Sequence, residues 1–153
     1  MSAMRFVRPI SAMLLLAGVT VSVTAPGRPE TVPGPVSARV LRVIGGDSIV
    51  VRARIWLGQD IDTKVRLDGV DAPEIKGKCE RERRLAKRAR DLILTRSAVG
   101  TVVLSDIHYG KYAGRVVARV RSPGGEDFST ALLKAGLGRA YKGGRRSSWC
   151  DGR

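Results

Sequence analysis

Three apolar runs with the alternation of β-strands follow one another along residues 36–67, and only short turns separate them. The first covers residues 36–44 and ends at Gly45-Gly46, the second covers residues 48–56, and the third covers residues 62–67. Such alternation turns one face of each strand toward a core. Three consecutive strands joined by short turns predict an antiparallel meander.

The apolar spacing changes to that of a helix between Glu80 and Arg96. The positions that recur at helical spacing are Leu85, Ala86, Ala89, Leu92 and Ile93. The opposite face is basic, and such a face is usually just a solvated surface. Strand patterns return at residues 101–107 and 115–121, and a second, shorter helix is expected at residues 127–135, before a helix stop at Gly136.

This order of elements predicts an α+β protein that is mainly β. Five strands with a helix after the third match a five-stranded Greek-key barrel of the oligonucleotide/oligosaccharide-binding (OB) type, with two helices packed on it. A chain of 153 residues has room for one such domain and not comfortably for two.

The N-terminal segment, residues 1–25, has the features of a signal peptide. Arg5 and Arg8 precede an uncharged apolar stretch, and Val23-Thr24-Ala25 resembles the small-residue pattern before a cleavage point. The stretch is short for a membrane-spanning helix, which needs about 20 apolar residues, so an uncleaved anchor is the alternative. We expect export to the periplasm or the exterior, with the protein either released or held by this segment.

Residues 26–35 contain four prolines and two glycines, a composition that predicts an extended linker. The folded domain is therefore expected to cover residues 36–153.

The chain is strongly basic, with 28 Lys and Arg against 14 Asp and Glu and a formal net charge of +14. Removal of residues 1–25 takes away two arginines and no acid, so the remainder keeps 26 − 14 = +12. This charge favours a polyanionic partner, either nucleic acid or an anionic membrane surface. The membrane alternative lacks an amphipathic helix with bulky apolar anchors. A generally basic, soluble surface is the plainer alternative.

Two cysteines, Cys79 and Cys150, make an even count behind an export signal, which predicts a disulfide. Two free thiols are the alternative. A metal site is less favoured, because two cysteines with only His108 in the whole chain make a poor ligand set.

Three carboxylates stand in turns beside the first strands. Asp47 follows Gly45-Gly46, and Asp71 and Glu74 flank a turn marked by Pro73. If these strands are neighbours, Asp47 and Asp71 can converge on one cation, and an oxygen-only site selects calcium or magnesium. The alternative is that turn aspartates bond only to their own backbone.

Two strand arginines have a geometry suited to phosphate. Arg66 lies in the third run, and Arg115 follows Gly114 at the start of a later strand, in the segment Lys111-Tyr112-Ala113-Gly114-Arg115. The planar guanidinium fork matches two phosphate oxygens and can neutralise charge that grows during attack on phosphorus. The alternative is ordinary surface arginines on strands.

These residues resemble the thermonuclease family, the staphylococcal-nuclease-like domains. The matching segments occur in the family's order over about residues 36–141: Gly46-Asp47-Ser48, Val65-Arg66-Leu67, Asp71-Ala72-Pro73-Glu74, Tyr112-Ala113-Gly114-Arg115 with Val116-Val117-Ala118, and Ala135-Gly136-Leu137. The cysteine pair and the tail Gly143-Gly144-Arg145-Arg146…Trp149-Cys150 are similar to those of exported bacterial members.

The resemblance implies a calcium-dependent endonuclease that hydrolyses DNA and RNA without strong sequence specificity and leaves 3′-phosphate ends. We expect single-stranded substrates to be preferred, no protein partner and a monomer. The implied roles are calcium binding by Asp47, Asp71 and the backbone carbonyl of Ala72; general-base or water-orienting action by Glu74; phosphate binding by Arg66 and Arg115; and nucleotide contacts near Lys111, Tyr112 and Tyr141.

Two hypotheses from different classes remain. One is the nuclease, and the other is a non-catalytic OB-fold module whose basic surface binds nucleic acid without cutting it. Asp47, Arg66, Asp71, Glu74 and Arg115 are all present, which favours the enzyme.

Overall fold

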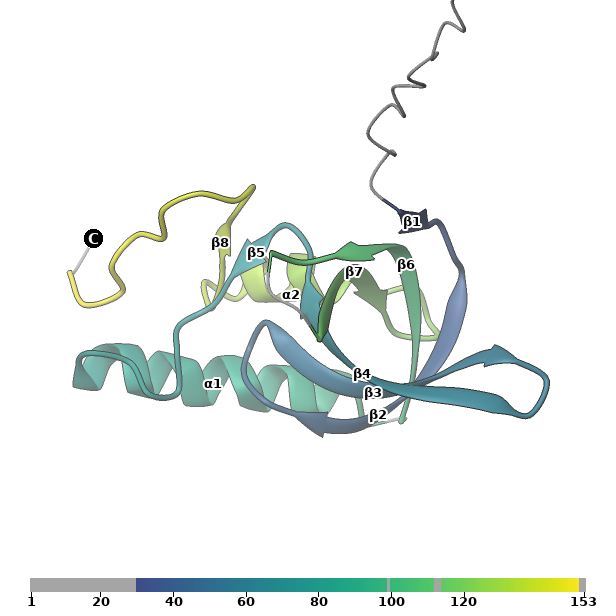
Figure 1. Cartoon of the computed structure of the whole chain (residues 1–153). Coiled ribbons are helices and arrows are strands. Elements are labelled where there is room, and N and C mark those ends of the chain that lie inside the picture. Colours follow the sequence, from purple (N-terminus) through teal and green to yellow (C-terminus); the bar gives the residue numbers. More distant parts are fainter. Residues whose placement is uncertain (1–29, 99, 112–113, 152–153) are drawn as a thin grey trace, which may run out of the picture.

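A computed structural model of the chain describes residues 30–98, 100–111 and 114–151. Five strands form a barrel in this part (Figure 1): β2 (Val36–Val43), β3 (Ser48–Trp56), β4 (Gln59–Leu67), β6 (Thr101–Tyr109) and β7 (Arg115–Arg121). The barrel closes because the pairings form a ring: β2 pairs with β3, β3 with β4, β4 with β7, β7 with β6, and β6 with β2. The β4–β7 pairing is parallel and the others are antiparallel. The predicted mainly-β, five-stranded OB-type barrel with two helices is confirmed.

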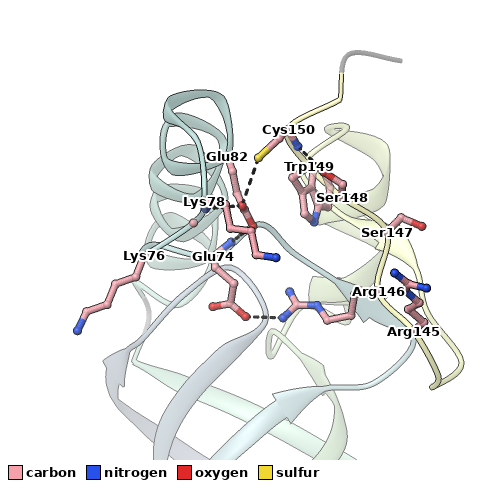
Figure 2. Close-up of a pocket in the computed structure, with 11 residues that line it drawn as sticks. Glu74, Lys76, Lys78, Glu82, Arg145, Arg146, Ser147, Ser148, Trp149 and Cys150 are labelled. Carbon is pink, nitrogen blue, oxygen red and sulfur yellow. Dashed lines mark hydrogen bonds and ion pairs between the residues drawn. The ribbon is translucent and has the colours of Figure 1, made fainter.

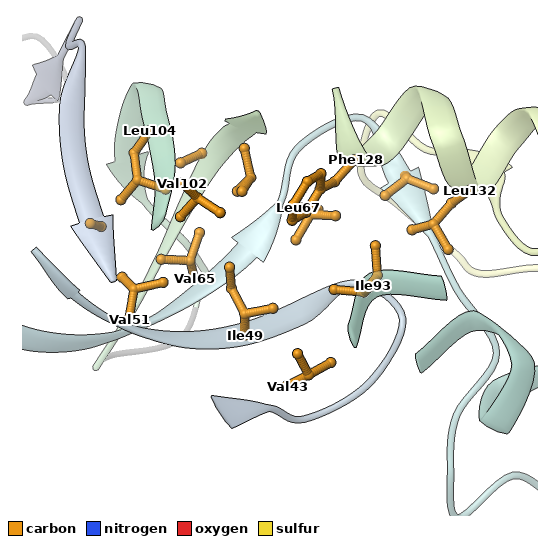
Figure 3. Packing of buried hydrophobic residues seen from close by; sticks show 14 of the residues in the cluster. Val43, Ile49, Val51, Val65, Leu67, Ile93, Val102, Leu104, Phe128 and Leu132 are labelled. Atoms are coloured by element: carbon orange, nitrogen blue, oxygen red, sulfur yellow. The ribbon is translucent and has the colours of Figure 1, made fainter. Parts of the chain in front are cut away.

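The barrel interior is a single apolar cluster to which every barrel strand contributes (Figure 3). On β3 the alternation is regular, since Ile49 and Val51 are fully buried while Arg52 and Arg54 are exposed. Helix α1 (Glu80–Arg96) adds Ala89 and Ile93 to this core, and helix α2 (Phe128–Lys134) adds Phe128 and Leu132. The helices therefore complete the core that the strands begin.

A second, two-stranded sheet was not predicted from the sequence. It consists of β5 (Val70–Asp71) and β8 (Arg139–Ala140), in which Asp71 pairs with Arg139. This sheet joins the chain after α2 to the segment that follows β4. From β8 the C-terminal tail, residues 141–151, runs toward the start of α1, where Cys150 forms a disulfide with Cys79 (Figure 1). The predicted disulfide is confirmed in the structure, and such bonds are typical of oxidising compartments outside the cytoplasm.

The predicted element boundaries agree closely with the observed ones. β3, α1 and β7 have the expected ends. β4 begins earlier than expected, at Gln59 and not at residue 62. The turn before it is short, formed by Leu57 and by Gly58 at a φ of 72°. A short additional strand, β1 (Thr31–Val32), pairs with β6 within the segment expected to be a linker.

The prediction of a signal peptide at residues 1–25 lies outside the described residues. Within the described ranges, none of the helices has the length and apolarity needed to cross a membrane.

Candidate active site

The turn that carries Asp47 lies against the end of β4 and the middle of α1. The backbone N–H of Leu67 donates to the carbonyl of Asp47 at 2.8 Å, which ties this turn to β4. Gly46 permits a close approach, since a Cβ there would lie 2.7 Å from the Cβ of Ala89 and 2.9 Å from that of Ala72. Glycine at this position therefore lets Asp47 approach the segment after β4.

Arg66 joins the two aspartates predicted to bind a cation. Its Nη1 donates to Asp47 Oδ2 at 2.6 Å, and its Nη2 lies 3.4 Å from Asp71 Oδ1. Asp47 is only 7% exposed and Asp71 only 3%. Buried carboxylates need compensating charge, so the Arg66 guanidinium stabilises both of them where they meet. The convergence expected from the sequence is therefore present, with an arginine between the two acids.

Ala72 and Glu74 lie in the segment that follows β5. Ala72 is buried, and Glu74 is exposed at the edge of the site. The backbone N–H of Glu74 donates to Glu82 Oε1 at 3.3 Å, and that of Lys78 donates to Glu82 Oε2 at 2.9 Å. Glu82, a buried carboxylate in the first turn of α1, thus holds the Glu74–Lys78 loop in place. Glu82 belongs by helical spacing to the charged face predicted to be solvated, and that prediction is wrong for this residue, which is buried.

Arg115 lies on the strand next to Arg66. β7 runs parallel to β4, with Arg115 opposite Lys64 and Val117 opposite Arg66. The two arginines predicted to bind phosphate therefore belong to adjacent strands of the barrel.

The predicted nucleotide-contacting residues divide into three cases. Tyr141 follows β8 beside the site, with the Arg66 guanidinium 5.6 Å from its ring centre. Lys111 is exposed just beyond the end of β6. Tyr112 lies outside the described residues.

Arg146, in the C-terminal tail, occupies the site although the sequence analysis assigned it no role (Figure 2). Its Nε lies 2.5 Å from Asp71 Oδ1, its Nη1 2.5 Å from Glu74 Oε1, and its Nη2 2.8 Å from the carbonyl oxygen of Ala72. Burial acts to lower the pKa of the Arg146 guanidinium, but the hydrogen bond to Glu74 and the charge of Asp71 outweigh it and raise that pKa. Arg146 is therefore a fixed positive charge.

Trp149 is a second residue of the tail that the sequence analysis missed. Its indole N–H donates to Asp71 Oδ2 at 3.3 Å, and the Arg139 guanidinium stacks 3.9 Å from its ring centre. A signal was available in the sequence, because the predicted bond between Cys79 and Cys150 brings the tail back to the loop that follows Glu74.

We name the carboxylates of Asp47, Asp71 and Glu74, together with the carbonyl of Ala72, the carboxylate site. Asp47, Asp71 and Ala72 present hard oxygen atoms, the ligand type that calcium and magnesium prefer. Two guanidinium groups already bind oxygens of this set, which marks it as a place where positive charge is stable. A separate cluster of Cys79, Glu82 and Cys150 has metal-like spacing, but its two sulfur atoms are bonded to each other and offer no thiolate.

Comparison with protein families matches residues 64–150, more than half of the chain, to the family described as staphylococcal nuclease homologue. The chain therefore belongs to the staphylococcal nuclease homologue family, in agreement with the OB-type barrel. The matched range includes Arg66, Asp71, Glu74 and Arg115, whereas Asp47 lies before it. No curated protein matches the chain significantly.

Proposed function

We propose that the protein is a calcium-dependent, exported nuclease that hydrolyses phosphodiester bonds of DNA and RNA. The observation that carries the proposal is the meeting of Asp47, Arg66, Asp71 and Glu74 at one site, although they come from separate segments of the chain. Family membership supports the same class of activity.

The residues fit a calcium ion by the chemistry of their donors. Asp47, Asp71 and the carbonyl of Ala72 would hold it, because carboxylate and carbonyl oxygens match its preference. When bound, calcium polarises a phosphoryl oxygen and favours attack on phosphorus.

The chain's own side chains supply the remaining functions. Glu74, the most exposed acid of the carboxylate site, orients a water molecule and accepts its proton. Arg66 has five N–H donors, and its contacts with Asp47, Asp71 and the Val70 carbonyl leave donors for a phosphate oxygen. Arg115 on the adjacent strand provides a second guanidinium, and together they stabilise the charge of the transition state.

Substrate affinity comes from the phosphates. The net charge of +14 attracts any nucleic acid, and none of the proposed roles needs a contact with a particular base. Binding is therefore expected to weaken steeply with salt and to depend little on sequence. Single strands are the proposed substrate, with Lys111, Tyr112 and Tyr141 near the bound nucleotide.

The test is cleavage of single-stranded DNA by protein purified from the full-length chain, with calcium and with chelator. Glu74→Gln and Arg115→Ala are each expected to lower the rate by about a hundredfold or more, since each removes a group that acts in the transition state. Glu80→Gln and Arg119→Ala are matched controls, because these residues form exposed ion pairs with Arg83 and Asp106.

The same assay separates the nuclease from a binding module. Cleavage that requires calcium and is lost in the two site variants supports the proposal. Wild-type protein that retards DNA on a gel but leaves it intact with calcium would instead identify a non-catalytic nucleic-acid-binding barrel.

A further inference from the structure

The C-terminal tail runs beside the carboxylate site, and the Arg146 side chain points from it toward Glu74 (Figure 2) and contacts Asp71 and Ala72. The tail also forms one wall of a cavity of about 760 Å³ whose other lining includes Glu74, Lys78 and Glu82. Arg146 itself lines this cavity, which leaves room for its side chain to move away from the carboxylates.

Two of the three contacts of Arg146 involve oxygens that a calcium ion would use. Its guanidinium lies within 2.8 Å of Asp71 Oδ1 and of the Ala72 carbonyl oxygen. A calcium ion binds such oxygens at about 2.3–2.6 Å, so it would occupy the same space as the guanidinium. Two positive groups in one position also repel each other strongly. Arg146 and calcium therefore exclude each other from Asp71 and Ala72.

Charge balance shows what the arginine does in the absence of a metal. The three acids Asp47, Asp71 and Glu74 face the two guanidiniums of Arg66 and Arg146, which gives −3 + 2 = −1. Without Arg146 the balance is −2, with Asp71 only 3% exposed. Arg146 therefore neutralises part of a buried negative charge that a divalent cation would otherwise neutralise.

The rest of the tail anchors both sides of Arg146. On one side the Tyr141 backbone N–H donates to the Gly69 carbonyl at 3.0 Å, and the Tyr141 hydroxyl donates to the Gly144 carbonyl at 2.8 Å. On the other side Arg139 Nη1 donates to the Ser148 carbonyl at 2.8 Å, and Cys150 is bonded to Cys79. These anchors do not involve the Arg146 side chain, so it can leave the carboxylates while the tail stays attached.

We propose that Arg146 is a tethered guanidinium that competes with a divalent cation for Asp71 and Ala72, so that the ion binds only when Arg146 is displaced. The inference rests on the proposed calcium site of the nuclease. The tether keeps Arg146 at a high effective concentration, which lowers the apparent calcium affinity of the protein.

The test is titration of the full chain, with its disulfide formed, with calcium chloride in a calorimeter. Arg146→Gln is expected to tighten calcium binding by about tenfold or more. The ion binds only the fraction of molecules in which Arg146 is displaced, so the apparent dissociation constant of the wild type is the intrinsic one divided by that fraction. Arg145→Gln is the matched control, since Arg145 is the exposed neighbour in the same tail. It removes the same charge and is expected to leave the affinity within about twofold of the wild type.

Tryptophan fluorescence gives a second readout that does not depend on activity. Trp149 touches Asp71, whereas Trp56, the other tryptophan, is 69% exposed on the β3–β4 hairpin. In a Trp56→Phe background the emission of Trp149 is expected to change on calcium addition, and at lower calcium concentrations when Arg146 is replaced by glutamine.

The outcomes distinguish this inference from the proposed function. Tighter binding in Arg146→Gln but not in Arg145→Gln supports it, even if no cleavage of DNA is found. Unchanged or weaker calcium binding in Arg146→Gln overturns it. That holds also if the variant cleaves DNA more slowly at saturating calcium, a result that would point to phosphate binding by Arg146. If neither wild type nor Arg146→Gln binds calcium, the inference and the calcium dependence of the proposed nuclease both fail.

Discussion

The β3–β4 hairpin and the carboxylate site both pair arginines with acids, but in opposite surroundings. On the hairpin, Arg52 bonds to Asp62 at 2.6 Å and Arg54 bonds to Asp60, with the Arg52 and Asp62 side chains 47% and 46% exposed. In the site, Arg66 bonds to Asp47 at the same 2.6 Å, with side chains only 14% and 11% exposed. Exposed pairs contribute little to stability because water competes for them, whereas breaking a buried pair leaves an uncompensated charge.

The two regions also differ in how far apart their partners are in the sequence. The hairpin pairs are directly opposite one another in the β3–β4 register, so the hairpin alone brings them together. In the site, Arg66 and Asp47 are 19 residues apart, and Arg146 and Glu74 are 72 apart. The β3–β4 pairing also brings Asp47 to Arg66, but the contacts of Arg146 with Asp71 and Glu74 form only when the disulfide-linked tail is in place.

The largest expected effect comes from removing the disulfide that attaches the C-terminal tail to the start of α1. The disulfide closes a separation of 71 residues, and its removal by Cys79→Ser with Cys150→Ser is expected to lower the free energy of unfolding by about 4 kcal/mol. Urea denaturation measures this loss. Serine at position 79 keeps a side chain that can cap α1, so the helix start is not the cause.

Wild-type protein treated with reductant serves as the control and is expected to lose the same stability. If the double variant unfolds at the same urea concentration as the oxidised wild type, the tail is not anchored by this bond.

The next effect compares one arginine from each region. Arg66→Ala is expected to lower DNA cleavage by about a hundredfold or more, because it removes one of the two guanidinium groups proposed to bind phosphate and leaves Asp47 without its charged partner. Arg52→Ala removes an arginine of the same sheet and is expected to leave cleavage unchanged. Initial rates at saturating calcium measure the difference. Equal rates for the two variants would mean that the buried Arg66–Asp47 pair matters no more for cleavage than the exposed Arg52–Asp62 pair.

Periodicity predicted the barrel, and the turn positions of Asp47 and Asp71 predicted that these two acids meet, as they do around Arg66. The alternation of Ile49 and Val51 with Arg52 and Arg54 defined β3, and helical spacing defined α1 to its observed ends. The β5–β8 sheet could not be predicted, since strands of two residues have no measurable period. Its formation depends on tertiary packing, not on a local pattern.

Arg146 could not be assigned for a related reason. In the sequence it is one of two adjacent arginines in a glycine-rich tail, and nothing distinguishes it from Arg145. Its position comes from tertiary contacts outside any motif, since the Cys79–Cys150 bond and the stacking of Arg139 on Trp149 bring it to Asp71. Glu82 was missed because its burial depends on the Glu74–Lys78 loop folding over it.

The smallest effect concerns the hairpin and its pH dependence. Hydrogen bonds from Arg52 and Arg54 hold the pKa values of Asp62 and Asp60 below their ordinary values. A carboxyl whose folded pKa is depressed contributes stability above its unfolded pKa of about 4, and this contribution disappears as the pH falls through the folded pKa. Asp60→Asn with Asp62→Asn is therefore expected to lower the melting temperature slightly at about pH 7 and not at about pH 2. Cleavage at neutral pH is expected to stay at the wild-type rate. A difference in melting temperature that persists at the acidic pH would show that these aspartates stabilise the hairpin by something other than their charge.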